Sequence, residues 1–323
     1  MAVKGSNGLK AVIEGGGCVA CGACLNLCPY IKRIEDRVVI IHPCGLDQGR
    51  CYDFCPNTPI ERPLKGGKIE DAMIAQSADP EIRSHAQYGG VVSSLLIDAL
   101  EMEMIDAVVL STSDDNIGAY PIIARTKDEI LSCASTRYVA SCAVSGLNIA
   151  LKEGYERIGF VGTPCQVKAV RKMKAARCDG NERIKLVVGL FCMWALDYRK
   201  LSAYLEEKIK SDILRLDIPL DGFVVVTEDE TFKLPLEEIK ILTRGGCEFC
   251  QDMTSELADI SVGAVEGVDD WNTVIIRNEV GKNLFNHALD TSKLKSGVLD
   301  KDRLTHLKEA SENKKRRAKK WVI

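Results

Sequence analysis

The cysteines constrain this chain more than any other feature of its sequence. There are 14 of them among 323 residues. The segment Met1 to Lys10 lacks the apolar core of a secretory signal peptide, so we expect a cytoplasmic protein. In that reducing compartment, so many cysteines indicate metal or redox chemistry rather than disulfides.

Composition limits the fold and the partners. With 46% hydrophobic and 28% charged residues, the chain can bury one large core and a smaller module. The net charge of -3 gives no reason to expect nucleic-acid binding. No apolar stretch approaches the roughly 20 residues that a membrane span needs, so we expect at most a peripheral position on a membrane complex.

Cys165 follows a predicted strand and opens a predicted helix. The apolar run Ile158–Val161 precedes the sequence Gly-Thr-Pro-Cys-Gln, and Val167 to Met173 has the pattern of a helix. A helix N-terminus favours a thiolate, because its dipole and free N–H groups stabilise negative charge. Cys165 is therefore well placed to bind a metal.

Three further cysteines complete a predicted ligand set. Cys192 ends the apolar strand from Ile184 to Phe191, and Cys247 with Cys250 forms a C-x2-C knuckle after two glycines. On ligand count alone, four thiolates suit zinc or a [4Fe–4S] cluster equally well.

The N-terminal segment favours iron and sulfur. Its cysteines have the spacing C-x2-C-x2-C-x3-C-P of bacterial ferredoxins and are Cys18, Cys21, Cys24 and Cys28. A second group resembles the other half of that motif with one cysteine missing, and consists of Cys44, Cys51 and Cys55. The short run from Val38 to Ile41 between them is rich in β-formers.

The ferredoxin pairing rule divides these cysteines into two clusters. The first cluster takes Cys18, Cys21, Cys24 and Cys55. The second takes Cys28, Cys44 and Cys51 and lacks a fourth ligand. Asp47 could supply it, the site could hold a three-iron cluster, or the ligand could come from solvent or from a neighbouring subunit. An ordinary exposed turn residue is an equal alternative for Asp47.

The chain divides into segments that differ in composition and hydrophobic pattern, and we expect a mixed α/β (α+β) fold. Residues 1–62 form the predicted ferredoxin-like domain. Residues 63–79 are rich in proline, glycine and charged residues and are predicted to form a linker. Alternating strands and amphipathic helices then predict a larger α/β domain over 80–295. Residues 296–323 form a basic helical tail, for which a solvated helix is favoured over one that docks an acidic partner.

Several segments of the larger domain could contact a cofactor. Gly89 and Gly90 open a predicted helix, whose free N–H groups could meet a phosphate or a flavin, although an ordinary helix entry explains them too. Ser135 to Tyr138 is predicted to open another helix, with Arg137 binding a pyrophosphate or lying in solvent. No Rossmann glycine motif and no P-loop occurs.

Two polar residues and a tryptophan lie in predicted strands. Asp259 and Ser261 could line a site or make structural hydrogen bonds. Trp271 could stack on a ring system or fill the core. Three cysteines have no partner at metal spacing and are interpreted as buried or incidental thiols, namely Cys133, Cys142 and Cys178.

Co-linear motifs between about residues 79 and 290 carry a family resemblance. They are Gln87–Val92, Ala134–Tyr138, Gly162–Gln166, Gly189–Cys192, Cys247–Cys250, Glu256–Gly263 and Trp271–Arg277. In order and spacing they resemble the family of coenzyme F420-reducing hydrogenase beta subunits. The N-terminal head is similar to those of formate dehydrogenase beta subunits and of the electron-input subunit of the membrane-bound dehydrogenase for reduced coenzyme F420.

The resemblance implies an FAD beside the cluster of Cys165, Cys192, Cys247 and Cys250, with coenzyme F420 as the substrate at the flavin face. The residues that it places around the flavin are Gly89, Gly90, Val91, Ser93, Ser135, Thr136, Arg137, Tyr138, Thr163, Pro164, Gln166, Asp259, Ser261, Gly263, Trp271 and Thr273. The family motif usually has an acidic residue at the position of Tyr88 and a lysine at that of Arg137. These departures bear on the choice of carrier.

The implied function is electron transfer between coenzyme F420, a hydride carrier, and a partner complex through FAD and [4Fe–4S] clusters. No catalytic acid or base is required, because hydride transfer to a flavin depends on positioning. The implied partners are subunits of a hydrogenase, a formate dehydrogenase, a heterodisulfide reductase or a membrane dehydrogenase. Two alternatives remain: the same relay with NAD(P)H, ferredoxin or a chlorophyll-type ring, and a polyferredoxin-like relay without a substrate.

Overall fold

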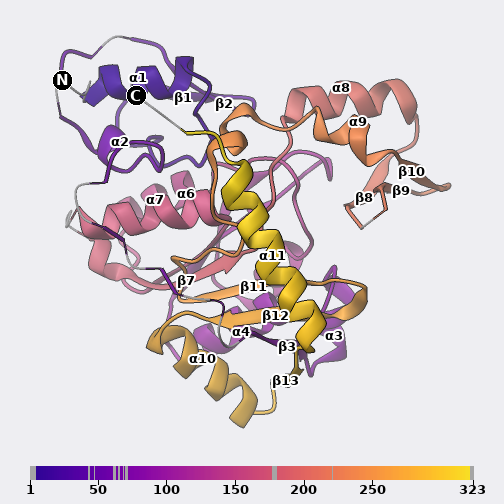
Figure 1. The fold of residues 1–323 in the computed structure, drawn as a ribbon. Coiled ribbons are helices and arrows are strands. Elements are labelled where there is room, and N and C mark those ends of the chain that lie inside the picture. Colours follow the sequence, from indigo (N-terminus) through magenta and orange to yellow (C-terminus); the bar gives the residue numbers. More distant parts are fainter. Residues whose placement is uncertain are drawn as a thin grey trace.

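A mixed, eight-stranded sheet forms the centre of the computed structural model, which describes residues 5–42, 44–46, 48–60, 63–64, 66–67, 69, 72–176, 180–219 and 221–320. The strand order is β13-β3-β12-β11-β7-β6-β4-β5 (Figure 1). In chain order the strands are β3 (Ala72–Ser77), β4 (Ala107–Thr112), β5 (Tyr120–Ala124), β6 (Ile158–Gly162), β7 (Ile184–Leu190), β11 (Ile260–Val265), β12 (Val268–Ile276) and β13 (Leu294–Val298). The mixed α/β fold predicted from the sequence is confirmed.

The middle of the sheet is parallel and buried on both faces. Strands β4, β6, β7 and β11 run parallel, and antiparallel strands flank them. Their runs of Val, Ile and Leu are apolar without alternation, as expected when helices cover both faces. The carboxyl ends of these four strands therefore meet at one edge of the sheet.

Helices cover the sheet in two groups. One core cluster joins it to α4 (Val91–Glu101), α5 (Lys127–Ser132) and α10 (Glu279–Asp290), with α3 (Pro80–His85) beside them. The other joins it to α6 (Ala143–Glu153) and α7 (Pro164–Ala175), which is followed by the 3-10 turn η1 (Asn181–Arg183). Both layers are needed because the parallel strands expose apolar side chains on each face.

A small separate sheet stands at one side of the molecule. It has the order β10-β9-β8, with β8 (Ile213–Asp217), β9 (Phe223–Thr227) and β10 (Thr231–Leu234), and packs with α8 (Tyr198–Lys208) and α9 (Leu236–Lys240) around its own core. Within it, β9 and β10 form an antiparallel hairpin in which Phe223 pairs with Leu234.

The N-terminal head has α1 (Gly5–Glu14), the hairpin of β1 (Ile31–Ile34) and β2 (Arg37–Ile40), and the short helix α2 (Arg50–Asp53). It docks on the start of α6. The N–H of Val144 donates to the carbonyl of Cys21 at 3.0 Å, and the Asn148 side chain donates to the carbonyl of Leu25 at 2.8 Å. A Cβ on Gly22 would lie 2.2 Å from the Cys142 carbonyl oxygen, so the two backbones touch.

Three sequence predictions differ from the structure. The range 63–79, expected as a linker, contains β3, which pairs with β12 and β13 inside the main sheet. The segment Ser135–Tyr138 opens no helix; it is irregular and leads into an isolated bridge between Val139 and Leu196. The tail forms helix α11 (Lys301–Arg317), but it is not simply solvated, because Ser311 and Lys314 are buried.

None of the described helices is long and apolar enough to cross a membrane.

Candidate functional site

The turn after β6 places Cys165 at the carboxyl edge of the sheet. Thr163 precedes the first turn of α7, Pro164 occupies the first position and Cys165 the second. The N–H of Thr163 donates to the Gln166 side-chain oxygen at 2.9 Å, which fixes the turn. Pro164 suits the first helical position because its missing N–H is not needed there. As predicted, the thiol lies at a helix N-terminus.

The other three cysteines of the main domain gather at the same edge. Cys192 lies just after β7, which is the parallel neighbour of β6. The 3-10 turn η2 (Gly245–Phe249) holds Cys247, and Cys250 follows it directly. The N–H of Ala195 points at the Cys247 sulfur at 3.3 Å, so the chain after Cys192 also orients the knuckle.

Electrostatics show that these four thiols are neighbours. Burial, together with the thiols of Cys250 and Cys247, raises the pKa of Cys165 to about 12. Burial also raises the pKa of Cys192, and the nearby ammonium of Lys314 is the largest opposing influence. Without a bound metal the site therefore favours neutral thiols, and four thiolates here require compensating positive charge.

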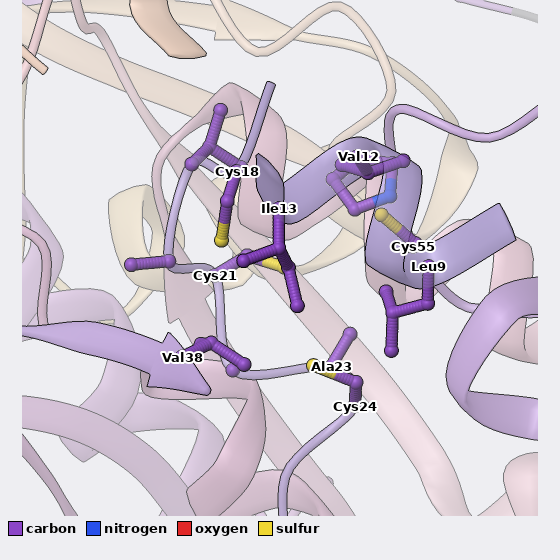
Figure 2. A pocket seen from close by; sticks show the side chains of 13 residues that line it. Leu9, Val12, Ile13, Cys18, Cys21, Ala23, Cys24, Val38 and Cys55 are labelled. Atoms are coloured by element: carbon purple, nitrogen blue, oxygen red, sulfur yellow. The ribbon is translucent and has the colours of Figure 1, made fainter. Parts of the chain in front are cut away.

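The first set of the head surrounds a pocket. In Figure 2 the sulfur atoms of Cys18, Cys21, Cys24 and Cys55 point toward one another beneath α1. Apolar side chains, among them Leu9 and Val12, form the rest of the lining. Burial is the main cause that raises the pKa of Cys55 to about 11 and those of Cys21 and Cys24 well above the ordinary value. The pocket suits a group that brings positive charge to four thiolates.

The second set of the head is also close together. Burial raises the pKa of Cys51, and the thiols of Cys28 and Cys44 raise it further, so the three side chains are neighbours. Asp47 lies outside the described residues, and its role as a fourth ligand stays a prediction. Cys178 lies outside them as well.

The three cysteine sets are contiguous. The thiol of Cys165 raises the pKa of Cys21, after the larger contributions of burial and Cys55. Likewise, Cys51 raises that of Cys24, after burial, Cys18 and Cys55. The first head set therefore lies between the main-domain set and the second head set. Such an order is what stepwise electron transfer between iron–sulfur clusters requires.

The type of metal group that these cysteines could hold depends on the number and spacing of the thiols. In the part of the chain that the structure describes, no three His, Cys, Asp or Glu side chains are close enough to hold one metal ion. A [4Fe–4S] cluster places one thiolate on each iron, so its cysteines stand farther apart than those around one zinc ion. It is the ferredoxin-like spacing of the head cysteines in the sequence that favours iron–sulfur clusters over zinc.

The glycine pair before α4 has a structural explanation. A Cβ on Gly89 would lie 2.9 Å from the Asn272 side-chain oxygen and 3.0 Å from the Ala75 carbonyl, so the turn packs against β3 and β12. Gly90 has φ of 72° at the N-cap of α4. Because the same Asn272 oxygen also accepts from the N–H of Val91 at 3.3 Å, little of this helix entry is free for a ligand. Ser93 is buried in the first turn.

Gln87 and Tyr138 converge on a residue that the sequence did not single out. The Gln87 amide donates to Asp217 Oδ1 at 2.8 Å, and the hydroxyls of Tyr88 and Tyr138 each donate to the same oxygen at 3.0 Å. Asp217 ends β8, so this cluster ties the small sheet to the entry of α4. Burial and the Asp217 carboxylate raise the pKa of Tyr88 to about 12.

Arg137 keeps binding capacity for an anion. Its Nε is buried and has no hydrogen-bond partner among the residues that the structure describes, and its neighbour Thr136 is held by the Gln87 side chain at 2.9 Å. Ser135 has φ of 119°, a conformation that is strained for a residue with a side chain. An unsatisfied guanidinium nitrogen is what a phosphate group of a dinucleotide would pair with.

Asp259 and Ser261 are engaged within the protein. The Asp259 carboxylate accepts from Arg171 at 2.6 Å, from the Val187 N–H at 2.7 Å and from Asn278 at 2.6 Å. Ser261 donates to the Ser255 carbonyl at 3.0 Å. Both side chains therefore make structural hydrogen bonds within the protein. A contact between these side chains and a flavin stays a prediction.

The remaining predicted contacts lie on β11, β12 and α7. A Cβ on Gly263 would lie 2.0 Å from the Phe191 ring, so this glycine makes room for the residue before Cys192. Thr273 is buried and donates to the Ala264 carbonyl at 3.0 Å, while Trp271 is half-buried. The Gln166 amide donates to Ser141 at 3.2 Å.

Sequence reasoning missed the lysines that touch the cysteine sets. The ammonium of Lys172 donates to the carbonyls of Cys55 and Thr58 at 2.6 and 3.0 Å, and burial lowers its pKa to about 8. Lys314 donates to the Cys192 carbonyl at 2.6 Å. The partners are 117 residues apart for Lys172 and Cys55 and 122 for Lys314 and Cys192. No local pattern in the sequence could have linked them.

The chain matches two models of one family, that of the coenzyme F420 hydrogenase/dehydrogenase beta subunits. Residues 72–148 match the model of the N-terminal part of this subunit, and residues 155–302 match the model of its C-terminal part. Together these ranges take in the whole main sheet and all four cysteines of the main-domain set.

Similar proteins belong to the same kind of subunit as these family models describe. The chain is 33% identical to the beta subunit of the coenzyme F420 hydrogenase of Methanothermobacter thermautotrophicus over 79% of this chain and 95% of the relative. It is 31% identical to a subunit of the F(420)H(2) dehydrogenase of Methanosarcina mazei over 88% and 86%. Among solved structures it is similar to a chain of the F420-reducing [NiFe] hydrogenase complex from Methanosarcina barkeri, with a TM-score of 0.74 and 31% identity over 80% of this chain and 93% of that one.

Proposed function

Since the chain belongs to the family of coenzyme F420 hydrogenase/dehydrogenase beta subunits, we propose that it is the oxidoreductase subunit that carries electrons between coenzyme F420 and a partner complex. The observation that carries the proposal is the contiguity of the three cysteine sets, which lead from the carboxyl edge of the main sheet into the head. A substrate carrier at one end and a partner subunit at the other would use such a series of one-electron sites.

The cofactors that fit are FAD and [4Fe–4S] clusters. When bound, a flavin exchanges a hydride with coenzyme F420 and single electrons with a cluster, which is the conversion that the proposed reaction needs. Cys165, Cys192, Cys247 and Cys250 would hold one cluster. Cys18, Cys21, Cys24 and Cys55 would hold a second, and Cys28, Cys44 and Cys51 a third with a further ligand.

The protein's own groups would position and insulate these cofactors. Arg137, with its unsatisfied Nε, would pair with a phosphate of the flavin nucleotide. The N–H of Ala195, aimed at the Cys247 sulfur, would stabilise a thiolate there. The apolar lining around Cys18 to Cys24 would keep water from the first head cluster.

The partner is proposed from the relatives. Two of them are named as subunits of a coenzyme F420 hydrogenase and of an F(420)H(2) dehydrogenase. We therefore infer a hetero-oligomer in which the head exchanges electrons with another subunit of a hydrogenase or a dehydrogenase. Subunits of formate dehydrogenase and of heterodisulfide reductase are further partners of the same kind.

The test is an anaerobic reconstitution with iron, sulfide and FAD. The protein is then mixed with reduced coenzyme F420 and an artificial one-electron acceptor, with NADH and NADPH in parallel. We expect rapid return of the oxidised coenzyme F420 absorption and no reaction of the nicotinamides. Cys192→Ser should abolish the reaction, while the matched variant Cys133→Ser, at a buried thiol outside the three sets, should retain it.

The other outcomes are equally informative. Clusters without bound FAD would favour a relay that has no substrate site. Bleaching of flavin and clusters by NADH, with reduced coenzyme F420 inert, would keep the cofactors and replace the substrate.

A further inference from the structure

Helix α11 lies beside the cysteines of the main domain, and most of it lies beyond the last residue of the family match. In the view of Figure 1, α11 runs across β11 and β12. Contacts fix this course: Arg303 Nε donates to the Glu266 carbonyl at 3.1 Å near its start, and the N–H of Lys319 donates to the Glu248 carbonyl at 2.7 Å just past its end. The end of α11 is thereby held against the knuckle.

One residue of this helix reaches the site. The ammonium of Lys314 donates to the Cys192 carbonyl oxygen at 2.6 Å, and the residue is only 2% exposed. Burial raises the pKa of Cys192, Cys165 and Cys247, and the charge of Lys314 opposes this rise at all three. Lys314 is therefore close to at least three of the four thiols.

The neighbouring lysines behave differently. Lys315 forms an ion pair with Glu256 at 2.9 Å, and Lys319 forms one with Glu248 at 2.6 Å, and both lysine side chains are more than a third exposed. Among the described residues, Lys314 has no carboxylate within ion-pair distance. Asp252 is the nearby acid, and its carboxylate does not come within ion-pair distance of Lys314.

A buried lysine without an acidic partner is unfavourable by itself. Lysine is almost never fully buried unless it is paired, because the ammonium loses its hydration when it leaves water. Ser311, one turn earlier on the same face of α11, is also buried, and its hydroxyl has no partner in the described part of the chain. The buried face of α11 is thus polar and turned inward, which a negatively charged group at the cysteines would explain.

We propose that Lys314 is a positioning residue whose charge raises the reduction potential of the main-domain cluster. This inference rests on the proposed function, because it needs a cluster at these cysteines. Reduction adds one negative charge to the cluster, and a fixed positive charge close by stabilises the reduced form more than the oxidised form. Loss of that charge should shift the equilibrium toward the oxidised cluster.

The test is a redox titration followed by electron paramagnetic resonance on the full-length, reconstituted protein. The main-domain signal is identified as the one that Cys192→Ser removes. In Lys314→Met we expect the ratio of reduced to oxidised main-domain cluster, at a fixed potential, to fall about tenfold, which corresponds to about 59 mV for a one-electron couple. The head clusters should not shift and serve as the internal reference.

Two variants separate charge from packing. Lys314→Arg keeps the charge and should stay within about twofold of the wild-type ratio. Lys315→Met makes the same change one residue along the helix, at a half-exposed side chain, and should also leave the ratio unchanged. A wild-type ratio in Lys314→Met, or an equal shift in Lys315→Met, would overturn the proposal.

Two further outcomes are also decisive. If Lys314→Met does not retain the main-domain cluster, Lys314→Arg decides: a retained cluster of wild-type potential supports the role of the charge, and loss of the cluster there refutes it. A wild-type protein without any cluster at Cys192 would instead refute the proposed function itself, and this is seen before any variant is made.

Discussion

At the scale of single residues, Asp259 shows how a polar group in a strand can be structural. Its carboxylate accepts from Arg171, from the Val187 N–H and from Asn278. We expect Asp259→Asn to lower the free energy of unfolding by about 3 kcal/mol, because Arg171 is left as a largely buried cation without its partner. Asp221→Asn, which breaks an exposed ion pair with Lys233, should leave stability nearly unchanged.

Urea denaturation of the two variants, without cofactors, measures this difference. Equal stabilities would show that the Asp259 network contributes little to folding. If Asp259→Asn were stable but failed to bind flavin, the cofactor contact predicted from the sequence would be the better explanation.

Arg137 carries the second prediction at this scale. If its unsatisfied Nε pairs with a flavin phosphate, Arg137→Ala should weaken FAD binding about 10- to 100-fold, the loss of one charge-assisted hydrogen bond. Arg125→Ala removes an exposed guanidinium nearby in the sequence and should bind FAD as wild type does. Fluorescence titration with FAD compares them, and equal affinities would remove Arg137 from the site.

The residues also show what a single sequence can reveal. The thiols could be grouped in advance, because ferredoxin spacing and strand ends are local patterns, and the observed neighbours of Cys51 and Cys165 match that grouping. Asp217 and Lys314 could not be found, because Asp217 meets Gln87, and Lys314 meets Cys192, across more than 100 residues of chain. Their roles depend on how distant elements pack.

At the scale of elements, the loop after β4 is held by one carboxylate. Asp115 accepts from the N–H groups of Gly118 and Ile117 at 2.6 and 3.0 Å and from the Tyr198 hydroxyl of α8 at 3.1 Å. Burial opposes its ionisation, but these hydrogen bonds outweigh burial and lower its pKa. The loop thereby joins the main sheet to the helix that covers the small sheet.

This gives a pH-dependent prediction. Because the folded pKa of Asp115 lies below the unfolded value, near about 3.9, its stabilisation is complete above that value and is lost as pH falls through the folded pKa. Wild type should therefore be more stable than Asp115→Asn at about pH 7 and pH 5, with the difference shrinking below about pH 4. Denaturation at several pH values checks it, and a difference that persists unchanged at about pH 3 would contradict it.

Elements were predictable where local signals agreed with tertiary packing. The turn between β6 and α7 could be predicted, because an apolar run, a proline at the first helical position and a glutamine cap coincide there. Strand β3 could not be predicted, because its short sequence follows glycines, prolines and charged residues. Its partner strands β12 and β13 also lie far along the chain. The segment Ser135–Tyr138 was misjudged as a helix start because Gln87 and Asp217, not its own backbone, supply its hydrogen bonds.

At the scale of the whole molecule, the head and the main domain make a close backbone contact at Gly22. Gly22 has φ of 88°, and a Cβ there would lie 2.2 Å from the Cys142 carbonyl oxygen and 2.8 Å from the Ser145 nitrogen. Gly16, also in the head, has φ of 79° with nothing within 4 Å. Both glycines have a positive φ, but only Gly22 contacts the main domain. Comparing substitutions at the two positions therefore separates the effect of backbone strain from the effect of docking.

We expect Gly16→Ala to cost about 1 to 2 kcal/mol of unfolding free energy through its positive φ alone. Gly22→Ala should in addition displace the head from α6, seen as faster hydrogen exchange in the head and at the start of α6. In the reconstituted protein, electron transfer between the clusters proposed for the head and the main domain should also be slower. Equal exchange and transfer in the two variants would mean that the head does not depend on this contact.

The docking of the head has a consequence for protein engineering. A ferredoxin domain is often treated as a unit that can be exchanged between redox proteins by joining it to a new linker. Here Val144 and Asn148 of α6 hydrogen-bond the carbonyls within the first cysteine motif, and Gly22 leaves no room for a side chain. A transplanted head would need a glycine at that position and carbonyl groups that face α6. Exchange of the head between proteins therefore depends on a matched interface, and not on the segment that connects the head to the main domain.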